Sequence, residues 1–400
     1  MPCNRTRAAR ILREHRLDAL ITSSQANLTY LLDYPQMSSC MSEATVFAVL
    51  PADPEAGLLV VASRNSASMV AEWCPEVQDV WLWGNYHVEF PPEVLVEQLP
   101  DLPRRQARML RDARTVGTAL EGLREGLRVR GLLGGRIGFD ERGLPSPRVY
   151  DQVVEALPGT EVVFAHHLFR KIRMIKTPEE IRRMERAAEI SDEALQASAQ
   201  AIRPGVTEAE MGEIYRQTVR RLGGIPIYVS INGGARGCLA TAEAGDYVLQ
   251  PGDGIRFDLN LSYRNYFGDT ARTASVGPPP EKLRRYHAAT AEGLARAEAA
   301  IQPGVKASEI FRLCMDTVRA AGMPNFKRNH VGHALGVECY DLPLIGPMDD
   351  TVFEEGMVVN LETPFYEVGL GAVHLEDTYA VTADGCRRFA RSSRDLIVAR

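Results

Sequence analysis

The sequence predicts two domains, an α/β layer structure followed by an α+β domain that contains two similar halves. Three observations predict this organisation. Short apolar runs alternate with helical patterns in the first part, a capped helix begins at Thr177, and a 23-residue segment recurs ninety-nine residues downstream. Four hundred residues also exceed what a single hydrophobic core usually serves. We therefore assign residues 1–169 to an N-terminal domain and residues 170–400 to a second domain.

The N-terminal part carries strand and helix patterns in alternation. Residues 6–17 have apolar side chains at helical spacing, and residues 105–127 are predicted to form one basic amphipathic helix. Short apolar runs predict strands at residues 18–24, 45–50, 57–63 and 161–166. Strands that alternate with helices are typical of a sheet covered by helical layers, so we expect an α/β domain.

A helix start marks the second domain. Thr177 is followed by Pro178, Glu179 and Glu180. This order provides an N-cap, a proline in the first turn, and acidic residues at the positive end of the helix dipole. The helical pattern continues to Ile202. A helix of this length can open a new packing unit.

An internal repeat follows this helix. Residues 201–223 and 300–322 are identical at ten of twenty-three positions, and both begin Ala-Ile-x-Pro-Gly-Val. The likeness continues downstream, where GDGIRFDLN corresponds to EEGMVVNLE. Two such halves predict a site at their interface that receives side chains from both. The glycine-rich residues 223–237 lack a phosphate-loop pattern and are expected to form a loop at the mouth of a pocket.

Composition and charge exclude several partner classes. The net charge is −6 and no basic cluster with interleaved aromatic residues occurs, which argues against a nucleic-acid partner. No apolar run approaches the ~20 residues that a membrane-spanning helix needs. The N-terminus has no hydrophobic signal core, and the seven cysteines are widely spread without a C-x-x-C pair. We therefore expect a cytoplasmic protein without a membrane partner or a cysteine-based zinc site.

Acidic residues stand at nearly matching places in the two halves, with two histidines between them. They are Asp258, Asp269, His330, His333, Glu362 and Glu376. Four carboxylates that face one interior repel one another and cannot all stay ionised without cations. With one imidazole they form a ligand set for two divalent metal ions. Its oxygen-rich, sulfur-free chemistry favours manganese, with cobalt, iron or zinc as the other choices. Such a pair supplies a nucleophile from water at neutral pH and polarises a carbonyl group.

At these motifs the sequence resembles the pita-bread metallohydrolases, the family of aminopeptidase P, prolidase, methionine aminopeptidase and creatinase. The motifs that carry the resemblance are DLNLSYRNYFGDTART, GHALG, ETP and the final Glu-Asp pair. The resemblance implies a pita-bread catalytic domain with an internal pseudo-twofold repeat, preceded by a creatinase-type α/β domain. It also implies that Glu362 acts as a general base. The implied metal ligands are Asp258, Asp269, His333, Glu362 and Glu376.

Three positions depart from the family's pattern. Thr241 and Tyr340 stand where the peptidases usually carry histidines, and His374 stands where they often carry arginine. Tyr340 and the following Asp341 are interpreted either as a turn before a proline or as a catalytic proton donor and base. These departures leave the predicted metal ligands unchanged. They do affect the expected preference for proline peptides.

Two further histidines are assigned to substrate binding together with Thr241. His330 lies three residues before His333, so on a strand the two side chains would face opposite sides, and we favour packing or support of the site for His330 over the role of a sixth metal ligand. His374 lies two residues before Glu376 and would share its face, which suits either packing or a place in the pocket wall.

The predicted activity is metal-dependent cleavage of a C–N bond. Short peptides of the Xaa-Pro type are the expected substrates of a dipeptidase or an aminopeptidase. The departures leave a second class open, a small non-peptide substrate such as a creatine-like or ectoine-type amidine, or elimination from a sulfonium propionate. A non-catalytic binding protein on the same fold is a third interpretation, and the retention of all five ligand types argues against it. The resemblance also implies a homodimer.

Overall fold

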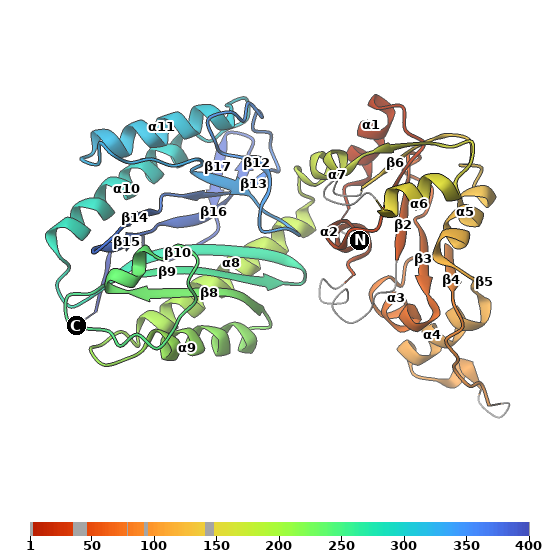
Figure 1. Ribbon diagram of the computed structural model, residues 1–400, viewed down its shortest axis with the longest axis horizontal. Helices are drawn as coiled ribbons and strands as arrows, with labels where there is room; N and C mark the ends of the chain where they lie inside the picture. The colour runs from red at the N-terminus through yellow and green to blue at the C-terminus, as the bar shows by residue number, and fades with distance from the viewer. Residues whose placement is uncertain (1–2, 35–45, 78, 92–94, 141–147, 400) are drawn as a thin grey trace. The chain divides into compact units, whose positions relative to one another are not determined.

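The chain divides into two compact units, residues 1–173 and residues 174–400 (Figure 1). The computed structural model describes residues 3–34, 46–77, 79–91, 95–140 and 148–399. The division follows helix α7 (His166–Arg173), which contains the predicted boundary after residue 169. Among the described helices, none combines the length and the apolar character needed to cross a membrane.

A seven-stranded sheet forms the centre of the N-terminal unit as described. Across the sheet the strands are β5 (Arg114–Val116), β4 (Asp79–Trp83), β3 (Leu59–Ser63), β2 (Phe47–Pro51), β1 (Ala19–Thr22), β6 (Arg136–Phe139) and β7 (Glu161–Phe164). Strand β2 is antiparallel to both neighbours, and the other neighbouring pairs are parallel. Besides α7, the helices are α1 (Arg5–Glu14), α2 (Gln25–Leu32), α3 (Ala67–Trp73), α4 (Asp101–Asp112), α5 (Ala119–Val129) and α6 (Arg148–Ala156). This mixture of parallel strands and helices confirms the predicted α/β class.

The single helix predicted over residues 105–127 is wrong. Helices α4 and α5 occupy the two ends of this stretch, with strand β5 between them. The β-branched residues Thr115 and Val116 pair with β4 in the extended conformation that such residues favour. The hydroxyl of Thr118 then accepts a hydrogen bond from the backbone N–H of Glu121 and starts α5. The similar amphipathic patterns of the two helices concealed this break.

A mixed sheet of nine strands forms the centre of the C-terminal unit as described. Its main path is β12 (Asp341–Leu344), β11 (Gly332–Ala334), β13 (Val358–Glu362), β16 (Glu376–Thr382), β10 (Tyr266–Val276), β9 (Gly254–Tyr263) and β8 (Ile225–Gly233). Strand β17 (Gly385–Arg388) pairs with β16, and β18 (Ile397–Ala399) pairs with β10. Strands β14 (Phe365–Glu367) and β15 (Gly371–Val373) form a separate pair. The helices are α8 (Pro178–Ala199), α9 (Glu208–Arg221), α10 (Glu281–Ala300) and α11 (Ala307–Ala320).

The two halves of the C-terminal unit are built alike, as the repeat predicts. Gly205 and Gly304, ninety-nine residues apart, have φ angles of 89° and 94° in the turns before α9 and α11. The helices α8 and α9 pack on β8, β9 and β10, while α10 packs on β13 and on α11. Figure 1 shows the two helix pairs on opposite sides of the strands. Each half has its own hydrophobic core between its helices and its strands. In each half, the face of the strands that is turned away from those helices can therefore carry polar side chains.

Two local predictions in this unit have opposite outcomes. Helix α8 begins as expected, because Thr177 and Glu180 form a reciprocal capping box with Pro178 in the first turn. The loop predicted over residues 223–237 is wrong, because β8 occupies its centre. Apolar side chains alternate with polar ones or proline from Ile225 onward, which is the period of a strand. The glycines at both ends of this segment are typical of a loop and obscure the alternation.

Candidate metal centre

The join between the two halves of the C-terminal sheet brings carboxylates into one row. Asp258 of β9 pairs with Ala271 of β10, and Ala271 pairs with Glu376 of β16. Glu376 in turn pairs with Glu362, the last residue of β13. Residues that pair directly across a sheet point to the same face. The three carboxylates therefore share one face, although they come from three strands and from both halves.

The same face carries the remaining two predicted ligands. Asp269 lies two residues before Ala271 on β10, so its side chain points the same way. His333 of β11 pairs with Asn360, which lies two residues before Glu362 on β13. All five side chains predicted to bind metal thus meet on one face. The structure brings them together opposite the two hydrophobic cores.

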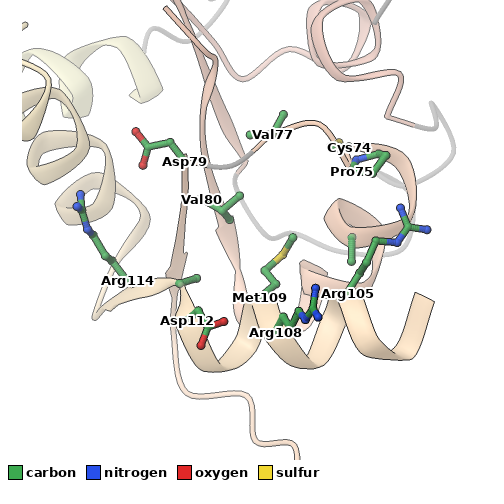
Figure 2. Close-up of a pocket in the computed structure, with 12 residues that line it drawn as sticks. Cys74, Pro75, Val77, Asp79, Val80, Arg105, Arg108, Met109, Asp112 and Arg114 are labelled. Carbon is green, nitrogen blue, oxygen red and sulfur yellow. The ribbon is translucent and has the colours of Figure 1, made fainter. Parts of the chain in front are cut away.

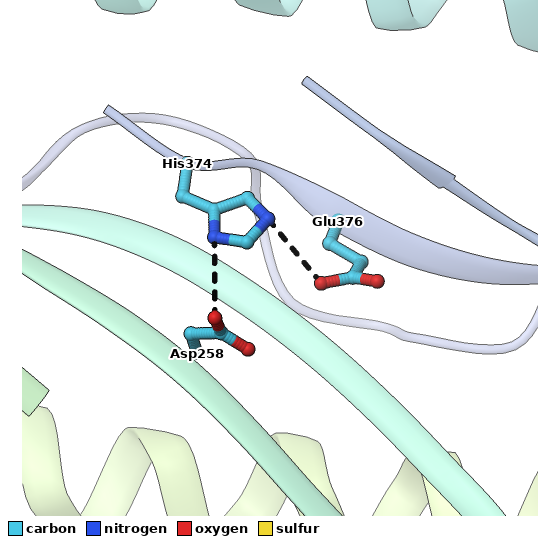
Figure 3. Close-up of side chains that lie close together, drawn as sticks. All are labelled: Asp258, His374 and Glu376. Carbon is cyan, nitrogen blue, oxygen red and sulfur yellow. Dashed lines mark ion pairs between the residues drawn. The ribbon is translucent and has the colours of Figure 1, made fainter. Parts of the chain in front are cut away.

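The side-chain atoms on this face form two groups with metal-ligand spacing, and Glu376 belongs to both. In one group, His333 Nε2 lies 3.8 Å from Asp269 Oδ2 and 3.9 Å from Glu376 Oε1. In the other, His374 Nδ1 lies 3.9 Å from Asp258 Oδ2, and His374 Nε2 lies 3.4 Å from Glu376 Oε2 (Figure 3). Within each group one atom per residue can be chosen so that all lie within 4.8 Å of one another.

The electrostatics of these groups fit bound cations. Burial, and then repulsion by the neighbouring carboxylates, raises the pKa of Asp269 and of Glu376 well above the usual range. Burial lowers the pKa of His333, which favours the neutral imidazole that ligates metals. The carboxylate and imidazole donors are buried together, and the nearby cationic side chains do not balance the charge of the carboxylates. Such a donor set suits divalent ions of the first transition row.

Glu362 has a different environment from the other carboxylates. His330 Nδ1 lies 2.9 Å from Glu362 Oε1, while Arg328 Nη2 lies 3.3 Å and His374 Nε2 3.6 Å from Glu362 Oε2. Burial alone would raise the pKa of Glu362, but contacts with His330 and His374 and the charge of Arg328 hold it well below its usual range. The group is therefore ionised. Arg328 is not among the residues predicted from the sequence, because no regular spacing links it to Glu362.

A second arginine holds Asp258, and it also escaped the sequence analysis. Arg256 Nη1 donates to Asp258 Oδ2 at 2.7 Å. Its Nη2 donates to Ser230 Oγ, Asn232 Oδ1 and the carbonyl oxygen of Leu239. The side chain is completely buried, so these partners fix its position. Because Arg256 lies two residues before Asp258, the period of a strand could have placed it on this face.

Neutral side chains orient the carboxylates from the same face. Asn260 Nδ2 donates to Asp269 Oδ1 at 2.6 Å, and Asn360 Nδ2 donates to Glu376 Oε1 at 2.8 Å. Thr378 Oγ1 donates to Asn360 Oδ1 at 2.5 Å and thereby orients the amide. Partners of this kind fix the direction of a ligand and tune its basicity. Each lies two residues from a predicted ligand, so alternation again provides the signal that could have found them.

The opposite face of the sheet anchors the strand that carries Glu376. The next residue, Asp377, is fully buried and contacts Arg272 Nη2 at 2.7 Å and Arg394 Nε at 2.6 Å. Burial would raise the pKa of Asp377, but the two guanidinium groups hold it below its usual value. Arg272 Nη1 also donates to the carbonyl oxygen of Glu376. Strand β16 is thus fixed to β10 directly behind the metal-binding face.

The other predicted site residues lie at different distances from the centre. The ring of Tyr340 stacks on His333, with centroids 3.8 Å apart, and its residue is 52% exposed. Asp341 is buried at the start of β12, and its Oδ1 accepts from the N–H of Leu342, so the residues before and at Pro343 form a strand rather than the expected turn. Thr241 is exposed in the loop after residues 234–238, and none of the described hydrogen bonds joins its hydroxyl to the centre.

A cavity in the N-terminal unit is lined by residues whose chemistry differs from that of the candidate metal centre. It measures about 870 Å³ and lies between α3, α4 and β4 (Figure 2). Arg105 and Arg108 line it from α4, and Asp79 lies on its strand side. Asp101 and Glu97 already pair with the two arginines. No metal-binding group of the described residues lies there, so the C-terminal centre is the candidate site.

Comparison with known proteins agrees with this assignment. Residues 182–383 match the model of metallopeptidase family M24, and residues 5–175 match that of the creatinase/prolidase N-terminal domain. An Xaa-Pro dipeptidase of Pyrococcus furiosus is 33% identical over 232 residues, which cover 58% of this chain and 67% of the relative.

Solved structures share the fold over nearly the whole chain. A structure of an Xaa-Pro dipeptidase from Bacillus anthracis has a TM-score of 0.80 at 22% identity, and it covers 99% of this chain and 100% of its own. The N-terminal domain of the FACT complex subunit SPT16 from chickpea has a TM-score of 0.70 at 16% identity, covering 99% and 98%. At such identities the likeness establishes only the fold. The family is established by the sequence matches, and the protein is therefore a metallohydrolase that belongs to metallopeptidase family M24.

Proposed function

We propose that the protein hydrolyses the peptide bond before proline in short peptides, with two divalent metal ions on the polar face of its C-terminal sheet. The observation that carries the proposal is the shared carboxylate, because Glu376 belongs to both ligand groups and can contact two ions at once. The relative from Pyrococcus furiosus is named for Xaa-Pro dipeptides, and this name supports the substrate class.

Five side chains are proposed as the ligands of the two ions. They are Asp258, Asp269, His333, Glu362 and Glu376. When bound, the ions supply a nucleophile from water and polarise the scissile carbonyl group. Manganese is our first choice, because carboxylate oxygens dominate this set, and cobalt, iron or zinc are the other choices.

Glu362 is the proposed proton acceptor. It is ionised, and His330 Nδ1 contacts its Oε1 at 2.9 Å. A proton that Glu362 takes from water can therefore pass to His330 and from there to the leaving nitrogen. Arg328 on the other carboxylate oxygen keeps Glu362 oriented during this transfer.

Tyr340 is the proposed contact for the substrate beside His333. Its ring is half exposed, so one face is available to an apolar group such as a proline ring. Burial and the nearby carboxylates raise the pKa of Tyr340 well above its usual value, so the phenol keeps its proton and can donate a hydrogen bond to the substrate. Thr241 is proposed to shape the loop around the site, and Asp341 to support the start of β12.

A small non-peptide substrate is the second candidate. The specific observation that favours it is the pair of buried guanidinium groups, Arg256 on Asp258 and Arg328 on Glu362. Together with Tyr340 and His374 in place of the usual peptidase residues, they change the charge pattern around the metal centre. Hydrolysis of a creatine-like or ectoine-type amidine, or elimination from a sulfonium propionate, would suit this pattern.

Release of free proline tests the proposal. The manganese-loaded protein is incubated with Xaa-Pro dipeptides and longer peptides, beside matched Xaa-Ala dipeptides and an Asp269→Asn variant. We expect turnover of the proline peptides, little turnover of the alanine peptides, and none by the variant. Two bound metal ions without any turnover of proline peptides would reject the peptidase and support the small-substrate candidate.

Three finer points belong to the same proposal. The metal is identified by elemental analysis of protein purified without added metal, where manganese is expected. The homodimer is tested by light scattering at several protein concentrations. A cytoplasmic location is expected from the sequence and is tested by fractionation of the producing cells.

A further inference from the structure

His374 is a buried imidazole without hydrogen bonds. The residue is 2% exposed, and neither Nδ1 nor Nε2 finds a hydrogen-bond partner among the residues that the structure describes. An unsatisfied buried polar atom costs about 1–3 kcal/mol, so such atoms usually have a function or a missing partner. Two of them on one ring, beside carboxylates, indicate a partner that the protein itself does not supply.

The backbone of His374 is held in place by one residue. The N–H of His374 donates to Thr273 Oγ1 at 2.8 Å, and the hydroxyl of Thr273 donates to the carbonyl oxygen of His374 at 3.1 Å. Thr273 pairs with Arg256 across β9 and β10, on the metal-binding face. His374 is therefore fixed before β16 begins, with its ring on the side of Glu376.

The environment of His374 resembles that of His333. His333 Nε2 faces Asp269 at 3.8 Å and Glu376 at 3.9 Å. His374 faces Asp258 with Nδ1 at 3.9 Å, and Glu376 and Glu362 with Nε2 at 3.4 and 3.6 Å. Figure 3 shows the ring of His374 between Asp258 and Glu376. The separations of 3.8 and 3.9 Å are too long for hydrogen bonds, and the 3.4 Å contact of His374 with Glu376 forms none either, so there is room for an ion between the donor atoms.

Other roles for His374 fit the contacts less well. A substrate-binding side chain needs an accessible face, and the side chain of His374 is only 3% exposed. Asp258 and Glu362 do not need His374 as an electrostatic partner, because Arg256 already contacts Asp258 and Arg328 already contacts Glu362. An imidazole that ligates a cation accounts for both the burial and the absent hydrogen bonds.

We infer that His374 is a sixth metal ligand, so that each of the two ions receives one imidazole nitrogen, one aspartate and the shared Glu376. The inference rests on the proposed two-metal function and adds a ligand to it. A second nitrogen donor raises the affinity of the site for cobalt, iron(II) and zinc, so Co²⁺ is a suitable probe of ligation. The metal held by Asp258 would then be as firmly bound as the metal held by Asp269.

Cobalt binding tests this inference without reference to activity. The full-length protein is stripped of metal and titrated with Co²⁺, and both stoichiometry and visible absorption are recorded. We expect two ions for the wild type. For His374→Gln we expect one ion to be retained and the other to bind more weakly by more than the roughly 10–100-fold typical of residues that only support a ligand. His330→Gln is the matched control, because His330 contacts Glu362 but belongs to neither ligand group.

A cysteine variant gives a direct signature of ligation. His374→Cys places a thiol where the imidazole stood, and its thiolate should produce a near-ultraviolet charge-transfer band with Co²⁺ that the wild type and His330→Cys lack. If the variants do not fold, pulsed electron paramagnetic resonance of the metal-loaded wild type counts the coordinated imidazoles, and two are expected.

The outcomes separate the inference from the proposed function. Wild-type protein that binds fewer than two cobalt ions contradicts the two-metal function itself. Two ions bound equally well by wild type and His374→Gln, with no new band in His374→Cys or with one coordinated imidazole, leave the function standing and overturn the role of His374.

Discussion

Tyr340 lies almost parallel to the imidazole of His333, with the ring planes inclined by 21° and the centroids 3.8 Å apart. The same tyrosine meets His330 edge-on, with an angle of 89° between the rings. One aromatic side chain thus fixes the orientation of a proposed metal ligand and also contacts the imidazole that bonds to Glu362. The position at which the sequence departs from its family is therefore part of the metal centre.

Replacing Tyr340 separates its ring from its hydroxyl. An aromatic contact of this kind is worth about 0.5–1.5 kcal/mol, so Tyr340→Ala should weaken metal binding several-fold by releasing His333. Tyr340→Phe keeps the stacking and should bind metal as the wild type does, while kcat should fall because the hydrogen bond from the phenol to the substrate is lost. Metal titration and steady-state kinetics of the two variants check this. Equal metal affinity of the alanine variant and the wild type would contradict the orienting role.

Neutral substitutions of two proposed ligands should remove metal without unfolding the protein. Asp269→Asn and Glu362→Gln keep the size of each side chain and remove its charge, so bound metal and activity should both fall below detection. The metal-free Asp269→Asn protein should be more stable than metal-free wild type, because it lacks a buried, repelled carboxylate. Each unit by which the pKa is raised corresponds to about 1.4 kcal/mol. Elemental analysis and thermal melts check this, and full activity of either variant would reject its role as a ligand.

The stabilisation by metal should increase with pH. The pKa values of Asp269 and Glu376 are raised in the folded, metal-free protein above the unfolded value of about 4. Their favourable contribution is fully present below the unfolded pKa and is lost as the pH rises through the folded pKa. A divalent ion relieves the repulsion between the ionised carboxylates, so the stabilisation of the fold by bound metal is largest at high pH.

Thermal melts with manganese and with a chelator, from pH 5 to pH 8, measure this difference. We expect the gain in Tm on adding manganese to grow steadily over the range. A gain that stays constant or shrinks as the pH rises would show that these carboxylates do not contact the ion.

The buried charges behind Glu376 should matter for stability more than those at the surface. Arg272→Met removes a fully buried guanidinium group from Asp377, and breaking such a pair typically costs about 3–5 kcal/mol. Arg387→Met is the control, since Arg387 pairs with Glu185 at a partly exposed position where a salt bridge is worth about 0–1 kcal/mol. Urea denaturation of both variants with metal removed measures the two costs. Similar losses would show that Arg394 and Arg388, whose Nη1 lies 3.3 Å from Asp377 Oδ2, suffice for Asp377.

Much of the centre could be predicted for two reasons. The side chains of a strand point alternately to its two faces, and the internal repeat provides acidic residues in both halves. Asp258 and Asp269 sit among apolar residues of paired strands, and the second half supplies Glu362 and Glu376 at corresponding places. Such local periodicity also fixes which face each side chain takes. The α/β character of the first unit followed in the same way from its short apolar runs.

The partners across the sheet could not be predicted in this way. Arg328 reaches Glu362 from a segment without regular structure, so only the folded chain shows the contact. His374 precedes the strand that carries Glu376, and its closeness to Asp258 depends on how the two halves join. Helices α4 and α5 were merged for a related reason, because the pairing of β5 with β4 overrides a continuous amphipathic pattern.

The position of Glu376 in both ligand groups couples the two binding events thermodynamically. An ion that takes one carboxylate oxygen withdraws negative charge from the other, while it also relieves the repulsion that burdens Asp269. The sign of the net effect decides whether loading is cooperative or sequential, and by linkage each ion must change the affinity of the other by the same factor. A calorimetric titration would then show one steep phase for cooperative loading or two separated phases for sequential loading. In either case the occupancy of the enzyme would respond to metal supply as a coupled pair rather than as two independent sites.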